Sequence, residues 1–139
     1  MALTYSDELI ARVLAESRTI ALVGASPRPE RASHRVMRFL QSRGHKVFPV
    51  NPREAGNTIN GETVLASLDD VPAQIDMVDI FRRSSEAGEA VDDAIRVAAK
   101  SVWMQLDVID EDAARRAEQA GLTVIMDRCP VIEYRRLGL

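Results

Sequence analysis

Short apolar runs alternate along this chain with segments of helical periodicity, and this alternation limits the fold more than any other feature of the sequence. Each run is rich in β-branched residues and ends in polar residues or glycine, as expected for a buried strand. Strands are predicted at residues 19–24, 46–50, 75–81, 101–106 and 123–126, with a weaker one at 63–65. Helices are predicted between them at 33–42, 86–99 and 110–120. The pattern is typical of an α/β protein with a doubly wound, mostly parallel sheet of five to six strands and helices on both faces.

Length and composition fit a single domain. A chain of 139 residues, of which 46% are hydrophobic, is long enough to bury most of its apolar surface around one core. We expect an N-terminal helix at about residues 4–17, capped by Thr4 or Ser6, followed by a core at about 18–139. Charged residues interrupt this first helix, so we expect neither a signal peptide nor a membrane-spanning segment.

Charge and cysteine content exclude several kinds of partner and site. The net charge of −3 argues against nucleic acid as a partner, because binding to phosphate backbones normally requires a basic surface. Cys129 is the only cysteine, which excludes an intramolecular disulfide and any multi-cysteine zinc or iron–sulfur site. We therefore expect a cytoplasmic protein that holds no metal.

The first predicted strand ends in a loop that suits a nucleotide. Gly24 lets the backbone approach a ligand closely, but the segment up to Ser33 contains only this glycine, whereas the dinucleotide pattern G-x-G-x-x-G requires three. Ser33 is predicted to be the N-cap of a helix whose free N–H groups face a phosphate, with Arg28, Arg31 and Arg35 close by. The alternative is a capping serine beside three solvated arginines.

The second predicted strand ends in Pro49-Val50-Asn51-Pro52. A dinucleotide-binding dehydrogenase presents an Asp or Glu to the ribose hydroxyls at this place, and no acid stands here. The missing acid and the missing glycines argue independently against NAD. The prolines and Asn51 suit the floor of an adenine pocket, although a turn that merely contains two prolines is the alternative.

Further motifs follow in order along the chain, most of them at the ends of predicted strands. They are Val23-Gly24-Ala25-Ser26-Pro27, Ser33 with Val36 and Leu40, Gly44, Pro49-Val50-Asn51-Pro52, Gly56, Gly61, Val78-Asp79-Ile80-Phe81-Arg82, Val102-Trp103-Met104-Gln105 and Met126-Asp127-Arg128-Cys129. Together they resemble the small stand-alone CoA-binding proteins, which are similar to the Rossmann domain of the succinyl-CoA synthetase α subunit without its ligase partners. The resemblance covers nearly the whole chain. It implies a single Rossmann-like domain that binds coenzyme A or an acyl-CoA and is not an enzyme by itself.

The resemblance also implies a place for each part of the ligand. Adenosine and phosphates would lie over the first two strand ends, with Ser33 at the pyrophosphate and Arg28 at the diphosphate or the ribose 3′-phosphate. The pantetheine arm would pass Phe81 and Arg82 and be closed by Trp103 or Gln105. The implied contacts are Gly24, Ala25, Ser26, Arg28, Ser33, Pro49, Asn51, Asp79, Phe81, Arg82, Trp103 and Gln105.

Other interpretations stay open for four of these residues and for the function. Phe81 and Trp103 are also typical packing residues, Asp79 could orient Arg82 through an ion pair, and Arg82 could be solvated. The alternative functions are an NAD(P)- or other nucleotide-dependent enzyme and an accessory subunit of an acyl-CoA ligase. A homodimer or a protein partner is compatible with each of them.

No catalytic residue is predicted. Cys129 has no second cysteine for redox exchange, and only His34 and His45 exist as possible bases. We predict that Cys129 is a buried residue at the start of a C-terminal helix, with Arg128 reaching the rim of the site or a partner subunit. A mixed disulfide between Cys129 and the CoA thiol is the less favoured alternative.

Overall fold

Five parallel strands form the centre of the molecule. In the computed structural model, which describes residues 5–139, they are β1 (Thr19–Val23), β2 (Lys46–Val50), β5 (Met77–Ile80), β6 (Ser101–Met104) and β7 (Thr123–Ile125). Their order in the sheet is β2-β1-β5-β6-β7, and every neighbouring pair is parallel. The chain moves from β1 to one side and then returns to the other. The topological switch point therefore lies between the carboxyl ends of β1 and β5, where open α/β sheets bind their ligands.

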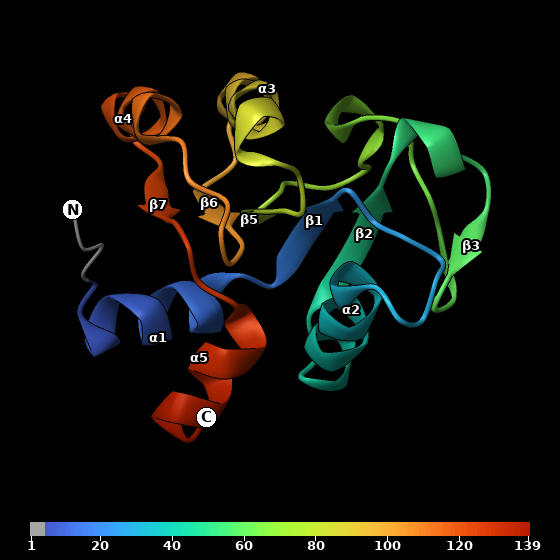
Figure 1. Cartoon of the computed structure of the whole chain (residues 1–139), viewed down its shortest axis with the longest axis horizontal. Coiled ribbons are helices and arrows are strands. Elements are labelled where there is room, and N and C mark those ends of the chain that lie inside the picture. The colour runs from blue at the N-terminus through green and yellow to red at the C-terminus, as the bar shows by residue number, and fades with distance from the viewer. Residues whose placement is uncertain (1–4) are drawn as a thin grey trace.

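Helices cover both faces of this sheet (Figure 1). One face carries α3 (Ser84–Arg96) and α4 (Glu111–Gln119), and the other carries α1 (Asp7–Glu16), α2 (Ala32–Ser42) and α5 (Pro130–Leu137). Successive residues of each strand contribute to the two apolar cores in turn, which explains why the strands read as continuous apolar runs. The predicted doubly wound, Rossmann-like α/β fold is confirmed.

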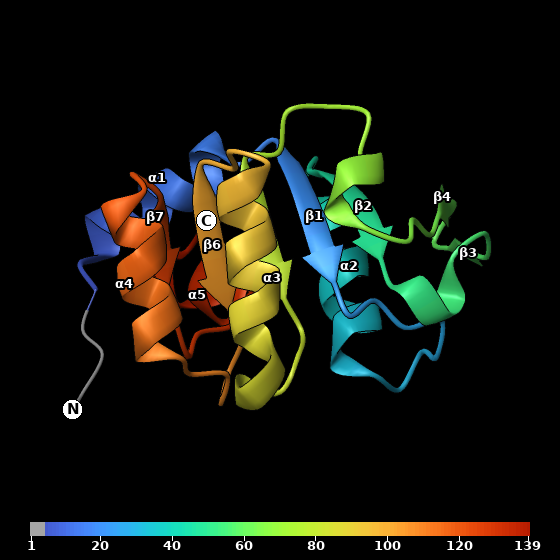
Figure 2. The same ribbon diagram turned by 90° about the horizontal axis from the view of Figure 1, so that it is seen from above.

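The weaker strand predicted at 63–65 is not part of the main sheet. β4 (Glu62–Thr63) instead pairs antiparallel with β3 (Thr58–Ile59), and Figure 2 shows this small hairpin beside β2. Leu65 forms one isolated parallel bridge with Val50 before the chain turns away. The turn at Asn60-Gly61, where both residues have positive φ, directs the segment into the hairpin.

The N-terminal helix begins at Asp7. Ser6 is its N-cap, because its Oγ accepts a hydrogen bond from the backbone N–H of Leu9 at 3.1 Å. The alternative cap, Thr4, lies outside the described residues. Between residues 5 and 139, no helix combines the length and apolar character needed to cross a bilayer.

Gly24 stands where the chain leaves β1, and no other residue fits its place. Its φ is +90°, and a Cβ at this position would lie 2.1 Å from the backbone oxygen of Phe81, at the end of β5. The Phe81 N–H donates to the carbonyl of Val23 at 2.8 Å, which joins the exit of β5 to that of β1. The Gly24 N–H donates to the carbonyl of Val50 at 2.9 Å, which joins the exit of β1 to that of β2. Direct backbone contact thus fixes the strand exits at the switch point.

Replacing Gly24 by alanine should destabilise the fold far more than the same change at Gly44. Gly44 has the same φ of +90°, but a Cβ at Gly44 would meet no atom within 4 Å, so Gly44→Ala isolates the cost of the backbone conformation. We expect a loss of about 1–2 kcal/mol for Gly44→Ala and about 3 kcal/mol or more for Gly24→Ala, measured by urea unfolding. Equal losses would contradict the close approach at Phe81.

Candidate ligand-binding site

A cleft of about 1000 Å³ opens at the carboxyl edge of the sheet. Its walls are the loop after β1, the first turns of α2 and α5, and the segments that follow β2, β5 and β6. The cleft therefore spans the switch point between β1 and β5. A ligand in it would contact segments from the first third of the chain to the last.

The walls of the cleft are strongly cationic. Seven arginines and a single acid, Glu54, line it; the arginines are Arg28, Arg31, Arg35, Arg53, Arg82, Arg83 and Arg135. Within residues 5–139, the guanidinium groups of Arg28, Arg31, Arg53 and Arg82 have no hydrogen-bond or ion-pair partner. On the α3 and α4 face, in contrast, arginines are paired with aspartates. Unpaired guanidinium groups around a concave surface favour a ligand with several anionic groups.

The first turn of α2 faces this cleft, although Ser33 is not its N-cap as predicted. The helix begins at Ala32, and Arg31 holds the N-cap position without a side-chain hydrogen bond to the first turn. A turn closed by the Arg31 N–H and the carbonyl of Arg28 shifts the start of the helix. Ser33 is instead a buried residue of the first turn that lines the cleft. The first intrahelical bond is donated by the N–H of His34 to the carbonyl of Arg31, so the N–H groups of Ala32 and Ser33 remain available to an anion.

Asn51 holds the loop after β1 in position. Its Nδ2 donates to the carbonyl of Ala25 at 2.8 Å, and its Oδ1 accepts the backbone N–H of Arg53 at 3.0 Å. Ser26 closes the next turn, because its Oγ accepts the N–H of Arg28 at 3.2 Å. Asn51, Ala25 and Ser26 all line the cleft, together with Gly24. The side chain of Asn51 is thus occupied mainly in shaping the site.

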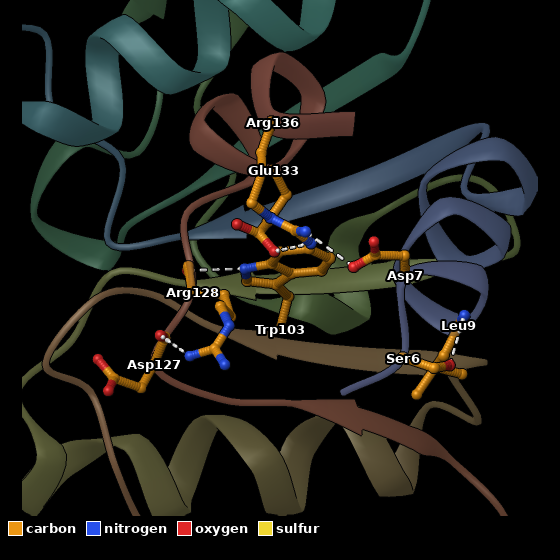
Figure 3. Close-up of polar contacts among 8 residues, drawn as sticks. All are labelled: Ser6, Asp7, Leu9, Trp103, Asp127, Arg128, Glu133 and Arg136. Carbon is orange, nitrogen blue, oxygen red and sulfur yellow. Dashed lines mark hydrogen bonds and ion pairs between the residues drawn. The ribbon is translucent and has the colours of Figure 1, made fainter. Parts of the chain in front are cut away.

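Two of the predicted contacts lie away from the cleft. Pro49 is buried within β2, beside Leu22 of β1, and does not line the cleft. Trp103 is fully buried on β6, where its indole N–H donates to the carbonyl of Arg128 at 2.8 Å (Figure 3). The structure therefore gives Trp103 the packing role that the sequence left as an alternative.

Arg128 also turns away from the cleft, and α5 is held by a different arginine. The guanidinium of Arg128 donates to the carbonyl of Asp127 (Figure 3). It also lies 5.4 Å from the centre of the Tyr5 ring. Arg136 donates to Asp7 of α1 at 2.8 Å and to Glu133 at 3.0 Å. These contacts fix α5 against α1, so that its first turn becomes a wall of the cleft.

Asp79 lies beneath the cleft and not in its wall. It is fully buried on β5, its Oδ1 accepts a hydrogen bond from Nε2 of Gln105 at 2.6 Å, and its Oδ2 has no partner. Burial raises the pKa of Asp79 to about 7, and the bond from Gln105 opposes this shift only in part. Gln105, Phe81 and Arg82 do line the cleft. The ion pair between Asp79 and Arg82, which the sequence left as an alternative, is not formed.

Cys129 lies half-buried in the cleft wall, at the N-cap position of α5. Burial raises the pKa of its thiol, against the opposing effect of the backbone amides of Ile132 and Val131. The thiol is therefore protonated at neutral pH and is a weak nucleophile. Neither histidine lines the cleft: His34 borders a hollow outside α2, and His45 bonds the carbonyl of Ser17.

The cleft wall contains residues that were absent from the predicted contacts, and four of them bear on the function. Arg53 stands three residues after the end of β2, so its position in the sequence was a usable signal. Leu106 comes directly after Gln105, yet a single exposed leucine attracts no attention in a sequence. Arg135 and Ile132 come from α5, whose place against α1 and α2 no local pattern shows.

The raised pKa of Asp79 makes the stability of the fold depend on pH. Below the ordinary pKa of 3.8, the carboxyl of Asp79 is protonated in both the folded and the unfolded chain. As the pH rises above this value only the folded chain keeps the proton, so the free energy of unfolding falls until the folded chain also loses it at about pH 7. Asn in this place stays neutral. The free energy of unfolding of Asp79→Asn should therefore exceed that of the wild type by on the order of 1–4 kcal/mol near pH 8, and by much less near pH 4. Urea unfolding across this range measures the difference, and a pH-independent difference would contradict the assignment.

Comparison with known proteins agrees with this architecture. Residues 18–135 match the family described as CoA binding domain. YneT of Bacillus subtilis is 36% identical over 123 residues, which cover 86% of this chain and 87% of that protein. The structure of a hypothetical protein from Pyrococcus horikoshii is similar over 100% of both chains, with a TM-score of 0.91 and 37% identity.

A larger enzyme contains a similar unit. A dinucleotide forming acetyl-coenzyme A synthetase of Ca. Korarchaeum cryptofilum matches with a TM-score of 0.68 and 26% identity, over 79% of this chain and 26% of that chain. The match to the family over most of the sequence, with a curated relative of similar length, is decisive: the chain belongs to the CoA binding domain family.

Proposed function

We propose that this protein binds coenzyme A or one of its thioesters in the cleft at the carboxyl edge of the sheet. The observation that best supports this is the set of seven arginines that line the cleft, together with the first turn of α2, which has no side-chain cap. Coenzyme A carries a diphosphate and a separate ribose 3′-phosphate, so it presents anionic groups at more than one place. Guanidinium groups bind such phosphates through paired, charge-assisted hydrogen bonds.

The order of the strands suggests how the ligand lies. The diphosphate would accept hydrogen bonds from the first turn of α2 and from Ser33 and Arg28, where the helix dipole favours negative charge. The adenosine would then lie toward the end of β2, with Arg53 available to the 3′-phosphate. The pantetheine arm would run the other way, past Phe81 to Gln105.

A dinucleotide-dependent enzyme is less well supported by the same site. The end of β2 offers Asn51, whose amide is occupied by the backbone of Ala25 and Arg53, where such enzymes need a carboxylate for the ribose. We propose binding without catalysis, because the protonated thiol of Cys129 has no histidine beside it. The similarity to part of an acetyl-coenzyme A synthetase supports the same class of ligand.

Calorimetric titration with CoA, NAD and ATP tests this function. CoA should bind most tightly, and Arg28→Ala or Ser33→Ala should weaken it, by about tenfold for the arginine, because a charge-assisted hydrogen bond is lost. Arg12→Ala is the matched control, since Arg12 is an arginine at the opposite edge of the sheet and should leave the affinity unchanged. Binding of NAD without binding of CoA would refute the proposal, and equal affinities in all three variants would refute the phosphate site.

A further inference from the structure

The chemistry of the cleft changes from one end to the other, and the change bears on the thiol end of the ligand. We propose that the cleft accepts CoA as the thioester of a short, uncharged, apolar acid and binds this thioester more tightly than free CoA. The inference rests on the proposed function, because the thiol arm is what would carry an acyl group to its place.

The apolar end of the cleft lies where β6 leaves the sheet. Leu106 and Val108 line it from the segment after β6, and Val131 and Ile132 line it from the first turn of α5. Leu106 and Ile132 are each 49% exposed, and they are two of the four large hydrophobic side chains exposed between residues 5 and 139. Both therefore stand uncovered on the wall of the same cleft whose other end holds unpaired arginines.

The length of the pantetheine arm fits this end of the cleft. About twelve bonds separate the phosphate oxygen from the sulfur, so the extended arm spans about 15 Å. Neighbouring strands lie about 4.8 Å apart, so two strand spacings, from β1 to β6, cover about 10 Å, which is within the reach of the arm. An arm that starts at the first turn of α2 would bring its sulfur close to Gln105 and Cys129. An acyl group on that sulfur would then lie against Leu106 and Ile132.

The apolar lining of this end disfavours an acyl group with a carboxylate. Leu106, Val108, Val131 and Ile132 offer no side-chain hydrogen bond to a charged group. Asp107 and Asp127, which are joined by a hydrogen bond of 2.7 Å from the N–H of Asp107 to the carboxylate of Asp127, do not line the cleft. A free carboxylate at the end of the acyl chain would lose its water against these apolar side chains without gaining a partner among them.

Calorimetry with CoA, acetyl-CoA, butyryl-CoA and succinyl-CoA tests the inference. Each methylene that becomes buried should tighten binding by up to about fourfold, so butyryl-CoA should bind about 5- to 15-fold more tightly than CoA. Succinyl-CoA, which has the same number of acyl carbons, should bind no more tightly than CoA. A Leu106→Ala, Ile132→Ala double variant should lose most of the preference for butyryl-CoA over CoA, when both affinities are measured on the same variant.

Ile109→Ala is the matched control, because Ile109 is 41% exposed but does not line the cleft, and this variant should keep the full preference. Equal affinities for CoA and butyryl-CoA would overturn the inference and leave the proposed function standing. Failure of every CoA compound to bind would overturn the proposed function itself. A dimer that the double variant dissociates, with an unchanged acyl preference, would assign Leu106 and Ile132 to a second copy of the chain and also overturn the inference.

Discussion

The contact between the exits of β1 and β5 is the constraint on which the rest of the site depends. At this point the backbone of Phe81 comes so close to Gly24 that no side chain fits between them. The loop after β1 must therefore leave the sheet at this residue, and Asn51 then holds it over the end of β2. The position of α2, and with it the direction of its free N–H groups, follows from that exit.

Local sequence patterns predicted the parts of the fold that depend on local physics. Each of the five sheet strands is an apolar run, and the glycine after the first of them marks the cleft in both sequence and structure. Ser33 was placed in the site but was wrongly predicted to be the N-cap, because a four-residue turn from Arg28 to Arg31 moved the helix start. Such a turn differs from a simple cap only by one backbone hydrogen bond, which a sequence does not display.

Contacts between distant segments could not be predicted in the same way. Trp103 stands two residues before Gln105 on the same strand end, yet one side chain is fully buried and the other reaches the cleft. Their difference depends on the segment that leads into α5, where the carbonyl of Arg128 accepts the indole N–H. The position of Arg135 in the cleft wall depends on the same packing of α5. A sequence shows that α5 exists, but the helices that it packs against are known only from the three-dimensional structure.

The placement of α5 has a consequence for the order in which the site becomes usable. One wall of the cleft is formed by a helix that follows all five strands and is tied to α1, which precedes them, through Arg136 and Asp7. A chain still emerging from the ribosome therefore lacks this wall even when its sheet is nearly assembled. A ligand that needs the complete cleft would stabilise only the finished fold, so its binding selects chains that have folded from the first helix to α5.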